Sequence, residues 1–404
     1  MLFTLRRCAS LFLISCVFLF LPGCWSGHEL ADQLIVLGIS LDKVNGQIRL
    51  TLQGIRSESS VTSGSGASSG AGSSSNPSST GGDKQSKFFL LSADGNSVQE
   101  ALQKIDRLTP RFLYYGHNQV FFIGEDLAKS GIMPYLDLFA RDQWSQESSW
   151  IIIAQGETGQ KLLTTTNLLV KYPSMGLAEL VRKHQIQIPT LFHFLLNYHG
   201  DSGAQILVSA HGITNTTSPP GYRINQLSLH PDALIQGDRL MGYLNNSDAE
   251  TYDWLENGFQ EASLSFPLSQ GQDSPLVGVS LSGEPANFRI SGSPELRVSL
   301  EMICDFTVTE NPEGHLNSPA DIRELENKLD DFLNQRFEQL FAHLKENKAD
   351  VFNLAKKVHA YQLPQWQNEQ SHWPEVYAEL PIDIVVNSHF RNSSIMQKYP
   401  GLKE

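Results

Sequence analysis

Cys24 is the residue whose surroundings most clearly indicate a chemical modification. Two arginines precede an apolar run from Leu11 to Leu21, and a Pro-Gly pair then leads directly to this cysteine. This order is typical of an export signal, and the cysteine stands where bacterial lipoproteins carry their acylated thiol. We therefore predict that residues 1–23 are a signal segment that is removed and that Cys24 is lipidated.

An uncleaved membrane helix is the alternative for this segment. The apolar run is shorter than the ~20 residues that a helix needs to span a bilayer, which disfavours that alternative. No later stretch of the sequence reaches this length, so the lipid is the only membrane attachment that we predict.

The remaining cysteines predict a fold without disulfide bonds. Cys8 and Cys16 leave with the signal segment, and acylation consumes the Cys24 thiol. Cys304 is then the one thiol left, so the mature chain can form no internal disulfide. It lies in an alternating apolar run, which predicts a buried cysteine on a β-strand.

A G-x-S-x-G sequence at residues 66–70 matches the motif that carries the nucleophile of many hydrolases. That motif needs a strand before it and a helix after it. Here it lies in a segment made almost entirely of Ser and Gly, which buries too little apolar area to offset its ordering entropy. We predict a flexible loop over residues 57–86 and a chance match to the motif.

The histidines show no metal-binding or catalytic spacing. His193 and His199 are not placed on one helical face at ligand spacing. His184, His193 and His199 could cluster, but a solvated or capping role is the prediction for them. The chain has no H-E-x-x-H, no C-x-x-C and no phosphate-binding glycine loop. It also lacks a nucleophile–base–orienter pattern. We therefore predict no catalytic residue, no metal and no cofactor.

Length and charge limit the class of protein. The chain has 404 residues and a formal net charge of −13. Removing residues 1–23 takes away two arginines and leaves 381 residues, enough for two or three domains. An acidic protein of this kind repels nucleic acid and anionic lipid headgroups. Membrane attachment is therefore expected through the lipid and not through net charge.

Strands and helices alternate along residues 24–200, which predicts an N-terminal α/β domain. Leu34–Leu41 and Gln47–Ile55 are predicted to form a hairpin around an Asn-Gly turn. An amphipathic helix follows, with Ser97 as its N-cap and Glu100 at the capping-box position. Later elements are predicted as helices at Glu125–Lys129, Pro134–Arg141, Gln160–Thr164, Met175–Lys183 and Leu191–Tyr198, and a strand at Trp150–Ala154.

The rest of the chain predicts two more domains. Residues 201–265 are expected to form a middle α+β domain, with short strands on either side of Pro231. Residues 266–404 are expected to form a C-terminal domain that combines strands with a long amphipathic helix. Its later elements are predicted as the long helix from Ser318, a shorter helix at Asn347–Lys357, a loop at Pro364–Trp373 and a strand at Ile382–His389. The predicted fold class is α+β and α/β, with three domains of mixed sheets flanked by helices.

Segments spread over most of the mature chain together resemble one known family. They are Cys24-Trp25, Glu29-Leu30, Ile35–Ile39, Asp42, Tyr115–His117, Gly124–Ile132, Ala233–Leu244, Asp350–Phe352 and Trp373. In this order, after a lipobox, they resemble the C-subunit, or Ger(x)C, lipoprotein family of spore germinant receptors in endospore-forming bacteria.

The resemblance implies a three-domain α/β fold without known enzymatic activity. It implies a lipoprotein on the outer face of the spore inner membrane, assembled with an A-type and a transporter-like B-type integral membrane subunit. Such a complex responds to small nutrients such as amino acids or sugars and triggers germination. The alternative function is a membrane-anchored extracytoplasmic lipoprotein that binds a small solute. The sequence leaves the nutrient unnamed.

His117, Glu125 and Arg141 are the candidate subunit-interface residues. His117, at a strand entry, either satisfies backbone groups or contacts a partner subunit. Glu125 lies at a helix start, where it also complements the helix dipole. Arg141 either forms a surface ion pair with Asp142 or contacts a partner. Asp42, after the first strand, is interpreted as a turn residue.

Overall fold

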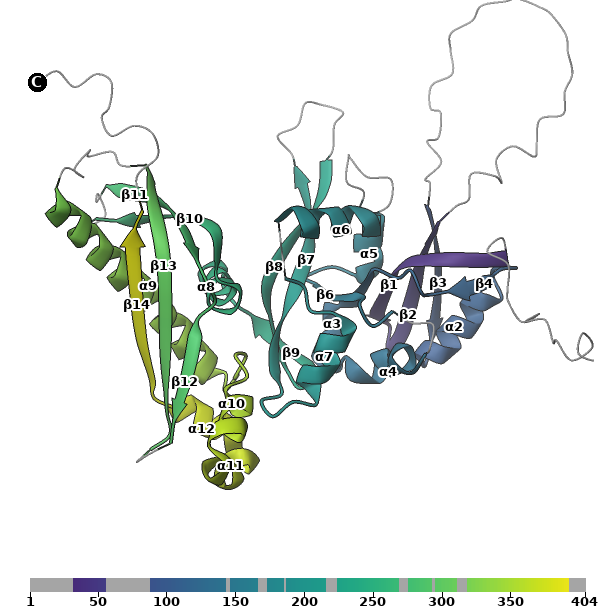
Figure 1. The fold of residues 1–404 in the computed structure, drawn as a ribbon. Helices are drawn as coiled ribbons and strands as arrows, with labels where there is room; N and C mark the ends of the chain where they lie inside the picture. Colours follow the sequence, from purple (N-terminus) through teal and green to yellow (C-terminus); the bar gives the residue numbers. More distant parts are fainter. Residues whose placement is uncertain are drawn as a thin grey trace, which may run out of the picture.

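The computed structural model describes residues 32–55, 88–142, 146–165, 173–184, 187–215, 224–268, 275–292, 295–310 and 318–391. Within these residues the chain forms two β-sheets, each packed against helices (Figure 1). The predicted signal segment, Cys24, the 57–86 loop and its G-x-S-x-G sequence lie outside the described residues. The mixed sheets and flanking helices confirm the predicted fold class.

The first sheet contains nine described strands. They are β1 (Gln33–Val44), β2 (Gln47–Ile55), β3 (Phe88–Gly95), β4 (Phe112–Tyr114), β5 (Val120–Gly124), β6 (Trp150–Ala154), β7 (Ala204–Asn215), β8 (Ile224–Gln236) and β9 (Arg239–Tyr243). Their order is β3-β2-β1-β5-β6-β7-β8-β9, and β4 pairs with the start of β1. Strands β1, β5, β6 and β7 run parallel. We call the edge where these four strands end the carboxyl edge, and the opposite edge the amino edge.

Helices cover both faces of this sheet. They are α2 (Val98–Asp106), α3 (Glu125–Ser130), α4 (Met133–Arg141), α5 (Gly159–Thr164), α6 (Pro173–His184) and α7 (Leu191–Tyr198). Buried side chains of α2, α3, α4 and α7 share one apolar cluster with the sheet, and those of α5 and α6 share another. The first sheet is therefore the middle layer of three, which buries its parallel strands on both faces.

Local signals fix several of these elements. Asn45 and Gly46 have φ of 50° and 79°, the left-handed pair that a two-residue hairpin turn requires, which confirms the predicted β1–β2 hairpin. Ser97 caps α2 by accepting a hydrogen bond from the backbone N–H of Glu100. The Glu100 carboxylate accepts from the backbone N–H of Asn96 and not from that of Ser97, so the predicted capping box forms one residue earlier.

The second sheet is built around one long strand. Its described strands are β10 (Phe259–Pro267), β11 (Leu276–Gly283), β12 (Asn287–Ser291), β13 (Arg297–Glu310) and β14 (Ile382–Phe390). One side of β13 pairs with β11 and then β12, both antiparallel, and the other side pairs with β14 in parallel. Cys304 lies on β13 as a free, buried thiol, as the sequence predicts.

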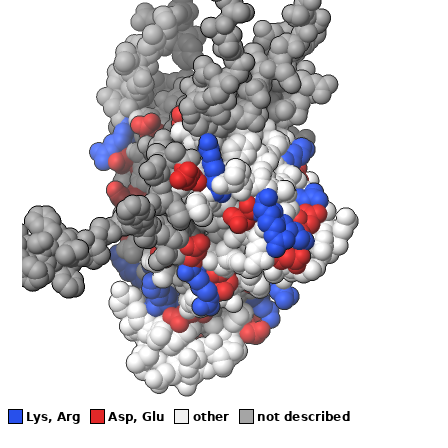
Figure 2. Space-filling model, turned by 90° about the vertical axis from the view of Figure 1, so that its right-hand side faces the viewer, with Lys and Arg blue, Asp and Glu red and all other residues white. Residues whose placement is uncertain are grey.

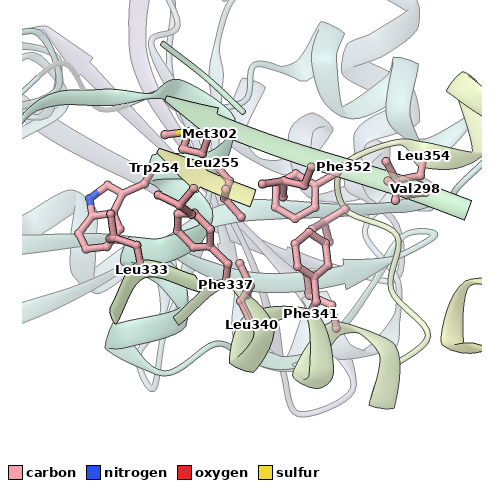
Figure 3. Close-up of a cluster of buried hydrophobic side chains, with 14 of the residues drawn as sticks. Trp254, Leu255, Val298, Met302, Leu333, Phe337, Leu340, Phe341, Phe352 and Leu354 are labelled. Carbon is pink, nitrogen blue, oxygen red and sulfur yellow. The ribbon is translucent and has the colours of Figure 1, made fainter. Parts of the chain in front are cut away.

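The long helix α9 (Pro319–Glu346) packs on one face of this sheet. Ser318 and Asp321 form a reciprocal capping box at its start. Figure 3 shows Leu333, Phe337, Leu340 and Phe341 of α9 directed toward side chains of β13 and of α8 (Asn246–Asn257). Burying each Leu or Phe contributes about 1.5–3 kcal/mol, so this stripe stabilises the packing of α9 on the second sheet.

The two sheets share part of one core. Ile206, Leu234 and Leu244 come from the first sheet region and belong to the same buried cluster as α9. Two polar contacts cross the same junction: Ser202 Oγ lies 3.0 Å from Asn353 Oδ1, and His359 Nδ1 lies 2.9 Å from Asp201 Oδ2. The predicted boundary between residues 200 and 201 falls between α7 and β7, and the three-domain division stays a prediction.

Three local predictions need correction. Pro231 does not split β8, which continues through a register shift opposite β7. The predicted helix at Asn347–Lys357 instead begins at Leu354, as α10 (Leu354–Tyr361). The predicted loop at Pro364–Trp373 is largely helical: α11 (Leu363–Glu369) and the 3₁₀-helix η3 (Gln370–His372) precede α12 (Trp373–Glu379). Proline is tolerated in a first helical turn, which the loop prediction overlooked.

Candidate functional site

Five polar residues gather on one face of strands β7 and β8 near the carboxyl edge. They are Ser209, His211, Ser228, His230 and Asp232, which we call the histidine–aspartate cluster. The antiparallel register places Ser209 opposite His230 and His211 opposite Ser228. Residues two apart on a regular strand share a face, so the pairing brings Ser209, His211, Ser228 and His230 together. Asp232 lies at the register shift and joins them through the interactions of Ser209 and His230 with its carboxyl group.

The two histidines lie side by side. Their ring centroids are 5.7 Å apart and the rings are nearly parallel, at 7°. His230 Nε2 lies 2.7 Å from Ser228 Oγ, within hydrogen-bond distance. Both rings are only partly buried, so the pair remains within reach of solvent.

Asp232 is the buried charge of this cluster. Only 6% of its surface is exposed, and burial raises the pKa of its carboxyl group against the opposing effects of Ser209 and His230. Among the described residues, neither its Oδ1 nor Nδ1 of His211 has a hydrogen-bond partner. Leaving such atoms unpaired is costly, and a ligand that donates to Asp232 would remove part of that cost.

Glu125 and Tyr243 extend the polar surface from the histidine–aspartate cluster to α3. Glu125 accepts hydrogen bonds from Gly156 N at 2.7 Å and Lys129 Nζ at 2.5 Å. Partial burial acts to raise the pKa of Glu125, but these two hydrogen bonds outweigh it and leave the pKa lowered. Burial raises the pKa of Tyr243, and the nearby carboxylates of Glu125 and Asp232 raise it further. The carboxyl edge therefore presents an ionised carboxylate, that of Glu125, next to a neutral phenol, that of Tyr243.

This arrangement favours binding over covalent catalysis. The Ser228–His230 distance would suit a nucleophile and its base, but no described carboxylate is hydrogen-bonded to the other ring nitrogen of His230. The described residues also contain no group of three or more His, Cys, Asp or Glu side chains that could hold a metal ion. In open α/β sheets, ligands bind beyond the carboxyl ends of the strands, which is where this cluster lies.

Asp42 also lies at the carboxyl edge, but its role is structural. The side chain is 1% exposed and accepts hydrogen bonds from Gly159 N at 2.7 Å and Gln160 N at 3.0 Å. It therefore caps the start of α5 from the neighbouring end of β1. Interpreting Asp42 as a turn residue was wrong, because it lies within β1 and the two backbone groups that it caps come more than a hundred positions later in the chain.

The three predicted interface residues do not form one site. Glu125 lies at the carboxyl edge, whereas His117 precedes β5 on the amino side, exposed, with its ring edge-on to Tyr114. Arg141 ends α4 and pairs with Asp137 at 2.8 Å, not with Asp142. Two residues before it, Phe139 packs against Tyr115, so Arg141 lies on the same side of β5 as His117. A contact of any of the three with another subunit stays a prediction.

A second polar centre explains one sequence block of the C-terminal part. Asp350 is 1% exposed and accepts hydrogen bonds from Leu354 N, Ala355 N and Trp373 Nε1 at 2.8, 2.7 and 3.0 Å. Burial raises the pKa of this carboxyl group even though the three donors act to lower it. Asp350 thus joins the start of α10 to α12, which is a packing role.

The histidine–aspartate cluster was not predicted from the sequence. Its signal is the period-two spacing of polar residues in two neighbouring strands, Ser209 with His211 and Ser228 with His230. Pro231 concealed this signal, because it divided the second strand into two short predictions.

Comparisons with known proteins match two consecutive segments of the chain, which divide within the β7–β8 region of the first sheet. The family model described as the spore germination protein N-terminal domain matches residues 26–210. The model described as spore germination B3/GerAC-like, C-terminal, matches residues 233–394. Together they span both halves of the chain.

Individual relatives agree with these matches. Spore germination protein KC of Bacillus subtilis (strain 168) is 23% identical over 415 residues, covering 96% of this chain and 97% of the relative. Spore germination protein YndF of the same organism is 21% identical, covering 95% of this chain and 97% of the relative. The crystal structure of the GerBC protein matches with a TM-score of 0.50 at 16% identity, over 88% of this chain and 97% of that one. That likeness shows a shared fold.

Proposed function

This chain belongs to the Ger(x)C family of spore germination proteins, and we propose that it is the non-catalytic lipoprotein subunit of a nutrient germinant receptor. In this proposal Cys24 carries the lipid and holds the protein on the outer face of the spore inner membrane. There it assembles with an A-type and a B-type integral membrane subunit, and the complex triggers germination. The observation that carries the proposal is the match of both halves of the chain to spore germination domains.

The amino edge of the first sheet is the side that faces the membrane subunits in this proposal. The chain enters β1 at that edge, so a lipid on Cys24 holds the edge near the bilayer. His117 and Arg141 lie toward it, and both side chains are exposed. No described helix meets the length and hydropathy that crossing a membrane requires.

Germination assays on spores of the native host test the receptor role. Deletion of the protein, or Cys24→Ala, is expected to abolish the response to a subset of nutrients while spores still form. Normal germination on every nutrient tested would contradict the proposal. Immunoblots of the spore inner membrane must accompany the assay, because a lipid-free chain is also expected to leave that membrane.

Single substitutions test where the partner binds. His117→Ala and Arg141→Ala are expected to reduce co-purification of the membrane subunits at normal protein levels. Arg297→Ala is the control, because it removes an exposed ion pair with Asp383 on the far sheet. Loss of co-purification with Glu125→Gln alone would instead place the interface at the carboxyl edge.

The histidine–aspartate cluster favours solute binding as a second candidate function. Calorimetry of the purified chain against amino acids and sugars tests it. Asp232→Asn is expected to weaken binding about tenfold or more, since hydrogen bonds to a charged group contribute ~1.5–3 kcal/mol. The exposed Asp383→Asn is the matched control. No binding heat with any nutrient would reject this second function and leave the receptor role untouched.

A further inference from the structure

We propose that the loop at residues 107–112 is a membrane-docking surface that inserts into the headgroup region of a phospholipid bilayer. This docking loop joins α2 to β4. The inference rests on the lipid anchor at Cys24 in the proposed function, and it adds a second point of contact that would fix how the protein stands on the membrane.

The docking loop exposes two large apolar side chains. Leu108 is 61% exposed and Phe112 is 53% exposed. A single exposed apolar residue is ordinary and needs no explanation. Two of them within five positions, beside the exposed Pro110, form a local apolar tip that gains free energy when it leaves water.

The position of this tip relative to the anchor is what points to a bilayer. Strand β4 pairs in parallel with the first three residues of β1, and Phe112 lies directly opposite Gln33. Cys24 is nine positions before Gln33, so an extended chain places the lipid within ~30 Å of the loop. Strand β4, which pairs with the beginning of β1 among the described residues, therefore carries the apolar tip to the membrane.

Charge around the docking loop is balanced and does not oppose docking. Arg107 and Arg111 are exposed, and neither forms an ion pair with a described residue. Asp32 and Asp106 are exposed carboxylates of the same end of the molecule. Figure 2, which faces this end, shows acidic and basic side chains interspersed. The two acids cancel long-range attraction, so apolar insertion must supply the binding.

The arginines have a local role in this geometry. Arg107 also complements the carboxyl end of α2, a role that needs no membrane. Guanidinium groups bind phosphate oxygens through two parallel hydrogen bonds, which suits the headgroup phosphates next to an inserted Leu and Phe. Zwitterionic phospholipids therefore suffice as the partner, and this resolves the conflict with the net charge of −13.

Depth measurements on the full lipidated protein test the proposal. The protein is reconstituted in phosphatidylcholine vesicles after Leu108→Cys labelling with a polarity-sensitive fluorophore. The native thiols do not interfere, because Cys304 is 1% exposed and Cys24 is acylated in the proposed function. Tyr361→Cys is the control, since Tyr361 is 76% exposed and belongs to α10, which lies in the C-terminal part, away from α2 and β4 (Figure 1).

We expect the labels at positions 108 and 361 to differ in their exposure to lipid and to water. The label at position 108 should be quenched by brominated lipid, and its accessibility to aqueous iodide should fall about tenfold below that at position 361. Adding Phe112→Asp should return position 108 to water while the protein still floats with the vesicles. Equal iodide accessibility at the two positions in floating protein overturns the docking loop but leaves the receptor role intact. Protein that does not float and carries no lipid on Cys24 overturns both.

Discussion

Gly124 lies against the Asp42 carboxylate at the carboxyl edge. A Cβ at Gly124 would lie 2.5 Å from Asp42 Oδ1, which is itself held by Gly159 N at 2.7 Å. The φ of Gly124 is −60°, so any residue fits its backbone, and the carboxylate alone explains the glycine. The pair therefore makes a testable unit.

Gly124→Ala is expected to destabilise the protein by ~1–3 kcal/mol, because the carboxylate cannot withdraw without losing its hydrogen bonds. Asp42→Ala should cost a similar amount through loss of the α5 cap. The double variant should cost less than the sum of the two, since the clash disappears with the carboxylate. Urea unfolding of all four proteins measures this coupling, and strict additivity would refute it.

Among single residues, helix caps with nearby partners could be predicted from the sequence, whereas the long-range partners of buried carboxylates could not. Ser97 was predicted as a helix start because Glu100 lies three positions later, and Ser318 because Pro319 follows it. Asp42 and Asp232 could not be placed, because the groups around them come from strands and helices far along the chain. Long-range pairing decides whether a carboxylate is a turn residue, a cap or part of a polar cluster.

Strand β14 lies at the edge of the second sheet, and side chains of α9 cover part of its open side. It pairs with β13 on one side, and acidic side chains of α9 cover part of the other. Asp330 Oδ1 accepts from Ser388 N at 2.8 Å, and Glu326 Oε1 accepts from Phe390 N at 2.9 Å. An uncovered edge strand is a template for aggregation, so these two contacts close part of a vulnerable edge.

Asp330→Ala is expected to expose this edge. The amide of Ser388 should exchange its hydrogen about tenfold faster or more, since a hydrogen bond to a charged group contributes ~1.5–3 kcal/mol. Glu324→Ala is the control, because it removes only the surface ion pair with Lys328. Hydrogen exchange followed by mass spectrometry measures the exchange rate of this segment. An unchanged rate at residues 386–390 would contradict a protective role for the Asp330–Ser388 hydrogen bond.

Element prediction succeeded where periodicity was clear and failed at prolines. The apolar run Trp150–Ala154 is β6 with the predicted bounds, and the stripe of α9 is buried as expected. Pro231 and Pro364 were interpreted as interruptions. The structure accommodates the first at a register shift and the second in the first turn of α11. Tertiary context made both tolerable, and a single sequence does not show that context.

Buried carboxyl groups set the pH response of the whole molecule. Burial raises the pKa of Asp42, Asp232 and Asp350 above that of an ordinary aspartate. Between the ordinary value and these raised values, the folded protein binds more protons than the unfolded chain. Its free energy of unfolding therefore decreases as pH rises through that window.

We expect the free energy of unfolding to rise as pH falls from 7 toward about 4.5, by ~1 kcal/mol or more. Exposed acids with lowered pKa, such as Asp94 and Asp137, withdraw their stabilisation only in more acid solution. Urea unfolding across this range measures the trend, and Asp350→Asn should flatten it whatever its effect on absolute stability. A steady decrease of stability from pH 7 to 5 would contradict this account.

The parallel pairing of β13 with β14 also governs how the chain can fold. Val298 pairs with Ile382, 84 positions later, and α9 lies between them. Closing so long a loop is slow, so the second sheet has high contact order and completes late. In the proposed export from the amino end, the chain cannot complete this sheet until nearly its last residues have crossed the membrane. Until then β13 presents one unpaired side, and a chaperone that shields extended chain would act on that intermediate.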